Sequence, residues 1–139
     1  MRILILGGHG FIGSHTSDIL KQQGHTIGVV DCYHQYYTFP DKEYFPVLQI
    51  RKDHANNDQT FIGKIEDESF MATVFQEFKP SVVVHLATYP NAKMVARNVT
   101  DATNNMVTAT AIILNLCVKS NVKRFVFASS SMAYGEFNG

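Results

Sequence analysis

The stretch Arg2-Ile3-Leu4-Ile5-Leu6-Gly7-Gly8-His9-Gly10-Phe11-Ile12-Gly13 predicts the fold of the whole chain. Its aliphatic residues favour a short buried strand, and the glycines that follow predict a sharp turn that opens directly into a helix. Such a turn points several backbone N–H groups and the positive end of a helix dipole at one place, where a pyrophosphate fits. A plain tight turn that needs glycine for positive φ is the alternative interpretation.

The three spaced glycines have separate expected roles. Gly7 lets the chain turn sharply off the strand, and Gly10 lets the backbone approach phosphates with no Cβ in the way. Gly13 lets the helix pack closely on the strand. The spacing therefore indicates a dinucleotide-binding turn, provided that the rest of the chain supplies a matching context.

Composition indicates one ordinary globular domain over residues 1–139, with 45% hydrophobic and 17% charged residues. Twelve basic and twelve acidic residues cancel, so nothing predicts a nucleic acid or an anionic membrane as partner. The longest aliphatic run, residues 3–6, is too short to span a bilayer, and the N-terminus does not resemble a signal peptide. Cys32 and Cys117 lack CxxC spacing and the six histidines lack ligand spacing, so no disulfide or metal site is expected. A cytoplasmic location is the default expectation.

Strands and helices are predicted to alternate along the chain. Strands are expected at residues 2–7, 26–31, 59–62, 81–86 and 124–128. Helices are expected at 11–23, 66–78 and 98–120, and a long loop from 32 to 57. The inner side of the first helix is predicted to be formed by Phe11, Ile12, Ile19 and Leu20. This alternation predicts an α/β fold with a Rossmann-like, doubly wound parallel sheet of strand order 3-2-1-4-5. Its ligand is expected at the carboxyl ends of strands one and four.

Asp31 ends the second predicted strand, eighteen residues after Gly13. A carboxylate there accepts hydrogen bonds from the ribose diol of an adenosine. It would also repel a 2′-phosphate, and no arginine follows it directly, so NAD is favoured over NADP as the cofactor. The alternative interpretation is an aspartate that caps a helix or a turn.

Several motifs together resemble the extended short-chain dehydrogenase/reductase family, and more narrowly its nucleotide-sugar epimerases and dehydratases. These motifs are Gly7-x-x-Gly10-Phe11-Ile12-Gly13, Asp31, His85-Leu86-Ala87, Asn105 five residues before Thr110, and the stretch 129–135, Ser-Ser-Ser-Met-Ala-Tyr-Gly. Within this group the chain is similar to UDP-glucose and UDP-glucuronate 4-epimerases, the latter through the tyrosine pair Tyr36-Tyr37. The resemblance extends from Met1 to Tyr134.

The resemblance implies roles for individual residues. The residues at the pyrophosphate would be Gly7, Gly10, Phe11, Ile12 and Gly13. Asp31 would bind the adenosine ribose and Ile65 would lie against the adenine. The diphosphate and nicotinamide half would be contacted by Ala87 and Thr88, with Asn105 also supporting the cofactor.

Ser130 would be the catalytic serine that hydrogen-bonds the substrate hydroxyl being oxidised. A serine at the end of a central strand is at the binding edge of the sheet, near the expected nicotinamide. The alternative is that residues 129–131 form a polar cluster that caps the strand end.

The chain departs from the family pattern where an Asp-Ile pair usually contacts the adenine, because it has Lys64-Ile65 there. A lysine cannot accept a hydrogen bond, so the adenine amine would lose an acceptor. We therefore expect either a lower NAD affinity than in typical relatives or a substitute acceptor, Glu66 or Asp67.

The second departure is that no Tyr-x-x-x-Lys pair, the family's base and its pKa-lowering partner, follows strand five in the 139 residues. We expect an NAD-binding part, truncated after strand five relative to the family, that binds NAD without turnover. A UDP-sugar would be a partner only with a completing segment. The alternatives are a non-catalytic NAD-binding regulatory or partner module, and a degenerate domain retained for its packing interface.

The predicted helix 98–120 has two neighbouring apolar stripes, which suggests burial on two sides. One stripe contains Ala102, Met106, Ala109, Ile113 and Leu116, and the other Val107, Thr110, Leu114 and Val118. One side fits the sheet and the other needs a partner. In the resembled family this helix joins a dimer, so a homodimer through residues 98–120 is expected.

Overall fold

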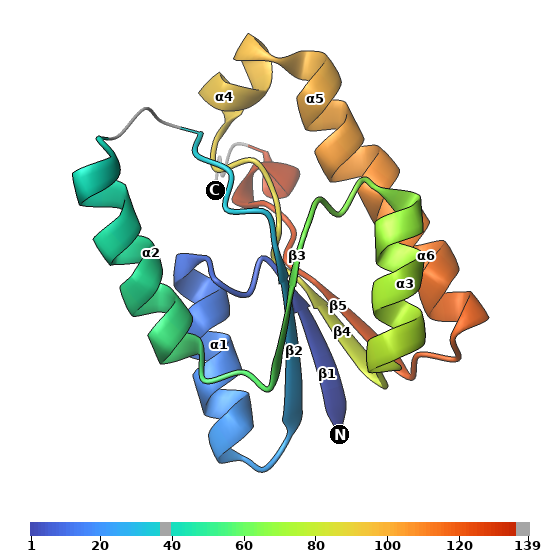
Figure 1. Ribbon diagram of the computed structural model, residues 1–139. Coiled ribbons are helices and arrows are strands. Elements are labelled where there is room, and N and C mark those ends of the chain that lie inside the picture. The colour runs from blue at the N-terminus through green and yellow to red at the C-terminus, as the bar shows by residue number, and fades with distance from the viewer. Residues whose placement is uncertain (37–39, 136–139) are drawn as a thin grey trace.

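The computed structural model describes residues 1–36 and 40–135 and contains the predicted five-stranded sheet (Figure 1). The strands are β1 (Arg2–Leu6), β2 (Thr26–Asp31), β3 (Gln59–Ile62), β4 (Val82–His85) and β5 (Arg124–Phe127). All neighbouring strands are parallel, and their order β3-β2-β1-β4-β5 confirms the predicted topology.

Helices cover both faces of this sheet, as a doubly wound fold requires. One face carries α1 (Phe11–Gln22) and α2 (Asp41–Ala55), and the other carries α3 (Glu68–Phe78) and α6 (Ala109–Lys119) (Figure 1). The short helices α4 (Ala92–Arg97) and α5 (Val99–Thr103) lie beyond the carboxyl ends of the strands. A one-turn 3-10 helix, Ser131–Tyr134, follows β5.

The core has two parts because alternate strand residues face opposite sides of the sheet. On the α3 and α6 side, Leu4, Leu6 and Val83 pack with buried residues of both helices. The other side holds a smaller cluster composed of Ile3, Ile5, Ile27, Val29, Val82 and Val84. The central strands are therefore apolar on both faces, as expected for a buried parallel sheet.

The prediction of which residues form the inner face of α1 is wrong. Phe11, Ile12 and Ile19 are 69%, 66% and 56% exposed, and only Leu20 packs against the core. The buried residues of α1 are small, namely Gly13, Ser14 and Ser17. Small residues let the helix backbone approach the glycine turn closely, and the large side chains consequently lie on the outer surface.

Two helices occur where loops were expected. α2 lies inside the predicted loop 32–57, and α4 lies just before the predicted helix 98–120. The sequence of α2 gives only a weak helical pattern of apolar residues, because Pro46 lies within the helix and Ala55 is its only buried residue. Its position depends on tertiary contacts with α1, including a hydrogen bond from the Ser17 hydroxyl to the carbonyl of Ala55.

The predicted helix 98–120 is divided into α5, a π-helical turn at Asn104–Thr108, and α6. The first apolar stripe is buried through Ala102, Ala109, Ile113 and Leu116, although Met106 is exposed. The aliphatic members of the second stripe, Val107, Leu114 and Val118, are exposed. Within residues 1–36 and 40–135, no helix combines the length and apolarity needed to cross a bilayer.

Candidate cofactor-binding site

The glycine turn, residues 7–13, leaves β1 at its carboxyl end and leads directly into α1. Gly7 has φ +79°, a left-handed conformation that favours glycine, and its N–H donates to the carbonyl of Val30 at 2.8 Å. Gly10 is the N-cap of α1 and accepts from the N–H of Ser14 at 3.0 Å. The turn therefore presents the N-terminal end of a helix at the binding edge of the sheet.

Gly13 has the tightest surroundings in this turn. A Cβ at this position would lie 2.2 Å from the carbonyl oxygen of Gly7, closer than any real carbon approaches. A Cβ on Gly10 would be 3.1 Å from the same oxygen. The glycines thus keep the turn folded tightly against α1, and the residues present fit a pyrophosphate held by backbone N–H groups.

Asp31 is tied to the glycine turn by a hydrogen bond. Its Oδ2 accepts from the backbone N–H of His9 at 3.1 Å, and its Oδ1 accepts from the N–H of Tyr33 at 2.9 Å. Each oxygen retains a further lone pair, because a carboxylate offers about four acceptor positions. The carboxylate is partly exposed and oriented, so it can accept from a diol that lies above the turn.

His9 is a structural residue of the site that the sequence pattern did not reveal. Its side chain is 3% exposed, with Nδ1 3.1 Å from the Tyr33 hydroxyl and Nε2 3.1 Å from Oδ1 of Asn57. These contacts join the turn to the segments that follow β2 and α2. The only available signal was its place inside the glycine motif.

Ala87 and Thr88 follow β4, directly beside the glycine turn. A Cβ on Gly7 would be 2.9 Å from the backbone nitrogen of Ala87, and the N–H of Leu86 donates to the carbonyl of Leu6 at 3.0 Å. Thr88 is exposed. The structure thus brings together two segments that are eighty residues apart, at the carboxyl ends of β1 and β4, where doubly wound sheets bind ligands.

The segment after β3 meets the π-helical turn at Glu66 and Asn105. Nδ2 of Asn105 donates to Oε2 of Glu66 at 3.4 Å, and Nζ of Lys64 is 3.7 Å from Oε1 of the same carboxylate. Ile65 is 5% exposed, with its side chain in the core. Asn105 is 9% exposed and its Oδ1 has no partner among the described residues. A buried acceptor left unsatisfied costs about 1–3 kcal/mol.

An aromatic contact connects the loop after β2 with the loop after β4. The rings of Tyr36 and Tyr89 meet edge to face with centroids 4.6 Å apart, and the Tyr89 hydroxyl donates to Oδ2 of Asp101. Burial raises the pKa of Tyr36, and the neighbouring groups Cys32, Tyr89, Glu66 and Asp101 raise it further. Tyr37, the second member of the predicted tyrosine pair, lies outside the described residues.

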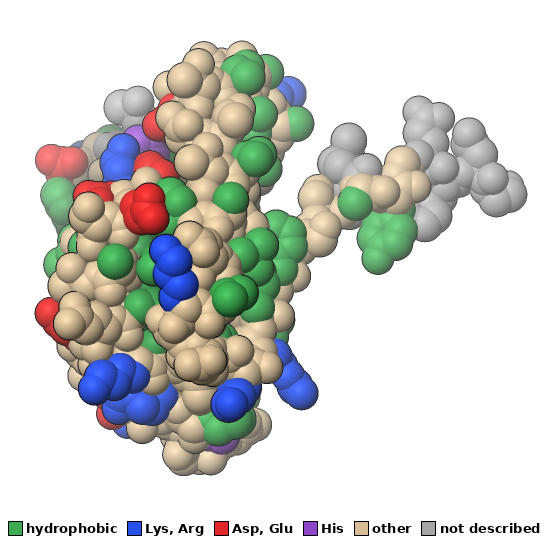
Figure 2. Space-filling view, turned by 90° about the vertical axis from the view of Figure 1, so that its right-hand side faces the viewer, with side chains coloured by type: hydrophobic (Ala, Val, Ile, Leu, Met, Phe, Trp, Pro, Cys, Tyr) green, Lys and Arg blue, Asp and Glu red, His purple; other side chains and the backbone are tan. Residues whose placement is uncertain are grey.

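Ser130 lies in the segment that follows β5. This segment projects from the body of the molecule (Figure 2), and both Ser129 and Ser130 are exposed. The backbone carbonyl of Ser130 accepts from the N–H of Ala133 at 3.0 Å, at the start of the 3-10 turn. The catalytic role of Ser130 stays a prediction.

His85, at the end of β4, is a buried neutral side chain. Burial lowers its pKa to about 4, and the residue is 2% exposed. The Thr110 hydroxyl donates to the carbonyl of Met106 at 2.7 Å, so His85 Nε2, 3.3 Å away, is the donor to Thr110. Nδ1 is then an acceptor, and it has no partner among the described residues.

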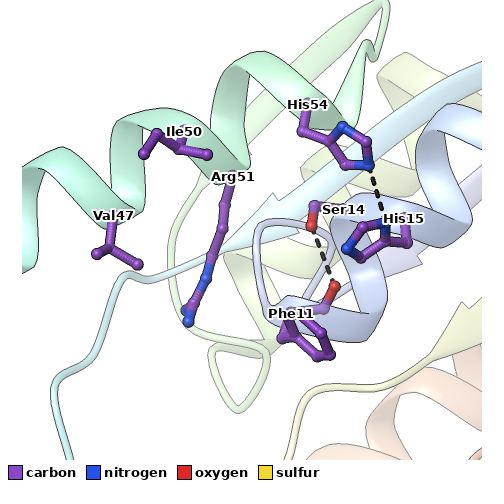
Figure 3. A pocket seen from close by; sticks show the side chains of 7 residues that line it. All are labelled: Phe11, Ser14, His15, Val47, Ile50, Arg51 and His54. Carbon is purple, nitrogen blue, oxygen red and sulfur yellow. Dashed lines mark hydrogen bonds between the residues drawn. The ribbon is translucent and has the colours of Figure 1, made fainter.

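A cleft of about 410 Å³ lies between α1 and α2, beside the glycine turn (Figure 3). Phe11, Val47 and Ile50 give it apolar walls, and the Arg51 side chain extends from α2 toward α1. His54 Nε2 and His15 Nδ1 are 2.9 Å apart across its end. Across residues 1–36 and 40–135, no three His, Cys, Asp or Glu side chains converge as metal ligands.

The family model described as "NAD dependent epimerase/dehydratase family" matches residues 3–139, almost the whole chain. The chain belongs to this family.

The family's named members show how much of a complete protein this chain represents. It is 32% identical over 138 residues to the UDP-glucose 4-epimerase of Caenorhabditis elegans, covering 97% of this chain and 39% of that relative. The chain therefore spans about two fifths of the length of the curated relatives that it first matches.

Solved structures of family members have the same fold. A UDP-glucose 4-epimerase of Stenotrophomonas maltophila, with bound NAD and formylated UDP-arabinopyranose, superposes with a TM-score of 0.81 at 25% identity, over all of this chain and 40% of that one. The enzyme of Thermotoga maritima, with UDP-glucose, gives 0.79 at 30% identity, over all of this chain and 41% of that one.

Proposed function

We propose that this chain is the NAD-binding portion of a nucleotide-sugar epimerase- or dehydratase-like protein and that it binds NAD without turnover when alone. The observation that carries the proposal is the hydrogen bond between Asp31 and His9, which fixes a carboxylate beside the glycine turn. This is the combination that a dinucleotide needs, with backbone N–H groups for the pyrophosphate and an acceptor for the ribose diol.

The individual roles follow from position. The N–H groups of Phe11, Ile12 and Gly13, at the start of α1, would face the pyrophosphate. The Asp31 carboxylate would accept from the adenosine ribose, and its charge would oppose a 2′-phosphate, which selects NAD over NADP. Ala87 and Thr88 would line the nicotinamide half, since they lie at the end of β4.

When bound, NAD supplies hydride acceptance from a sugar carbon. Ser130 would hold the sugar hydroxyl by a hydrogen bond, and removal of that hydroxyl proton requires a base. No Tyr-x-x-x-Lys pair that could serve as this base and its partner follows β5 in the 139 residues. Tyr89 and Lys93 have this spacing, but they follow β4, and the Tyr89 hydroxyl donates to Asp101. We therefore expect the chain to bind a UDP-sugar and to turn it over only together with a completing segment. We expect the protein to be located in the cytoplasm.

Isothermal titration of the purified chain with NAD and NADP tests the binding, and an assay with UDP-glucose tests turnover. We expect NAD to bind more tightly than NADP and no product to form. Gly10→Val should abolish binding because its side chain would crowd the carbonyl of Gly7, whereas Gln22→Ala, on the exposed side of α1, should not. Absence of NAD binding would refute the proposal, and turnover by the chain alone would refute its second half.

We further propose that the chain forms a homodimer through the exposed stripe of α6 and the preceding turn, defined by Val107, Leu114 and Val118. These side chains are 64%, 43% and 78% exposed. Figure 2 views this side of the molecule, where hydrophobic side chains gather over the helical layer. Exposed apolar patches of this kind mark sites of association.

A further inference from the structure

The cleft of about 410 Å³ between α1 and α2 has no part in the proposed NAD binding. The pyrophosphate would meet backbone N–H groups at the start of α1, and the ribose would meet Asp31, which does not line the cleft. The volume is within the range of about 300–1,000 Å³ that is usual for small-molecule sites. The cleft is therefore a candidate for a second ligand.

The walls of the cleft are apolar and exposed. Phe11 of α1 is 69% exposed, and Ile50 and Val47 of α2 are 67% and 45% exposed. The rings of Phe11 and His15 meet edge to face with centroids 5.3 Å apart, which extends the wall along α1. Large apolar side chains that remain exposed together around a hollow are typical of ligand sites. These walls fit a hydrocarbon group.

Arg51 adds a positive charge to this apolar cleft. Its side chain is half-buried and extends from α2 toward α1 (Figure 3). Among residues 1–36 and 40–135, no carboxylate lies within ion-pair distance of its guanidinium. Asp53 of α2 accepts instead from the Gln49 amide at 2.6 Å, and Asp18 of α1 from the Gln22 amide at 2.7 Å. The cleft thus contains a planar fork of N–H donors that lacks an anion.

Two contacts between α1 and α2 hold the cleft open at a set width. Nε2 of His54 and Nδ1 of His15 are 2.9 Å apart at one end of the cleft, and the Ser17 hydroxyl donates to the carbonyl of Ala55 further along the same helices. The cleft is therefore formed before a ligand binds, and binding does not have to bring the helices together.

We propose that this cleft binds an amphipathic carboxylate, the anion of a medium-chain aliphatic acid. The carboxylate would pair with the guanidinium of Arg51, which matches its two oxygens, and the hydrocarbon chain would pack on Phe11, Val47 and Ile50. Charge complementarity selects this ligand, because an alkylammonium ion would place a second positive charge beside Arg51. The inference goes beyond the proposed function and does not depend on NAD binding.

Isothermal titration of the full chain with sodium octanoate, and separately with octylammonium chloride, tests the charge preference. The wild type should bind octanoate at least about tenfold more tightly than octylammonium, as expected when a charged hydrogen bond is gained by one ligand alone. From hexanoate to decanoate, each added CH₂ should raise the affinity about two- to fourfold, because each is removed from water.

Two pairs of variants assign these effects to the cleft. Arg51→Gln should weaken octanoate binding at least about tenfold, whereas Lys42→Gln removes the same charge from an exposed residue of α2 outside the cleft and should not. Ile50→Ser should reduce the gain in affinity for each added CH₂. Ile19→Ser is its control, since Ile19 is 56% exposed on α1 and does not line the cleft.

Three results would overturn the inference and leave the proposed function unaffected. The first is no heat of binding with octanoate at about 10 mM, well above a millimolar Kd. The second is equal affinity for octanoate and octylammonium, or an unchanged octanoate affinity in Arg51→Gln, since the cleft would then not recognise the carboxylate. The third is displacement of octanoate by NAD, which would place the anion at the glycine turn instead of between the helices.

Discussion

The backbone N–H of His9 donates a 3.1 Å hydrogen bond to Oδ2 of Asp31, and together with the bond from the Gly7 N–H to the Val30 carbonyl it fixes the glycine turn relative to the end of β2. The remaining oxygen, Oδ1, is held by the N–H of Tyr33. The carboxylate is thus oriented before any ligand binds, so binding does not have to restrict its rotation. Its charge and its position can be tested separately.

Asp31→Asn keeps the size of the side chain and removes its charge. We expect NAD affinity to fall about tenfold or more, because a charged acceptor contributes about 1.5–3 kcal/mol to a hydrogen bond. The preference for NAD over NADP should also shrink, since the repulsion of a 2′-phosphate is removed. Titration calorimetry measures both, and Asp53→Asn, an exposed aspartate of α2, is the control. An unchanged preference would show that Asp31 does not face the ribose.

Gly13→Ala should destabilise the fold, because the new Cβ would lie 2.2 Å from the carbonyl oxygen of Gly7. Both atoms belong to tightly held backbone, so relief requires α1 to move away from β1. We expect a loss of about 1–3 kcal/mol, measured as a Tm several degrees lower by circular dichroism. Gln22→Ala in the same helix should change Tm little, and a wild-type Tm for Gly13→Ala would contradict the close packing.

His85 should make stability depend on pH. Its folded-state pKa, lowered to about 4 by burial, is below the ordinary value of 6.5, so the unfolded state binds the extra proton between these values. The free energy of unfolding should therefore fall as pH decreases from 6.5 to 4, by up to about 3 kcal/mol.

His85→Gln provides the comparison for that pH dependence, since its amide can still donate to Thr110 but does not titrate. Urea unfolding at a series of pH values should give a shallower slope for this variant than for the wild type. The other histidines are present in both proteins, so their contributions cancel when the two slopes of unfolding free energy against pH are subtracted. Parallel slopes would show that His85 is accessible to protons in the folded state.

Leu114→Glu should convert a dimer to a monomer, because it places a charge in the middle of the exposed α6 stripe. Sedimentation velocity over a range of concentrations measures the change. Val47→Glu is a matched control, since Val47 has similar exposure, 45% against 43%, on α2. A monomeric wild type at high concentration would contradict the proposed dimer.

The sheet could be predicted because each of its strands carries a local signal. The aliphatic run at residues 3–6 and the strand that ends at Asp31 are apolar on both faces, and right-handed crossovers then leave few strand orders. The tight turn was predictable for the same reason, since the spacing of Gly7, Gly10 and Gly13 is itself the steric requirement.

Contacts between distant segments could not be predicted in this way. α2 has little apolar periodicity, and its place depends on partners in α1 such as Ser17. The outward direction of Phe11 and Ile12 likewise follows from the close approach of small residues rather than from the helical pattern. Glu66 and Asn105 meet across thirty-nine positions of sequence, and no periodicity reports such a pair.

β5 is an edge strand of the sheet, and Val126 and Phe127 on it are about half exposed. Among the described residues it pairs with β4 alone. An exposed edge strand is a template to which a strand of another polypeptide can add by β-augmentation. Arg124 and Lys123 place positive charge at the start of β5, and this charge opposes parallel pairing of the β5 strands of two copies of the chain. The colloidal behaviour of the isolated chain should therefore respond to ionic strength, with screening of these charges favouring aggregation.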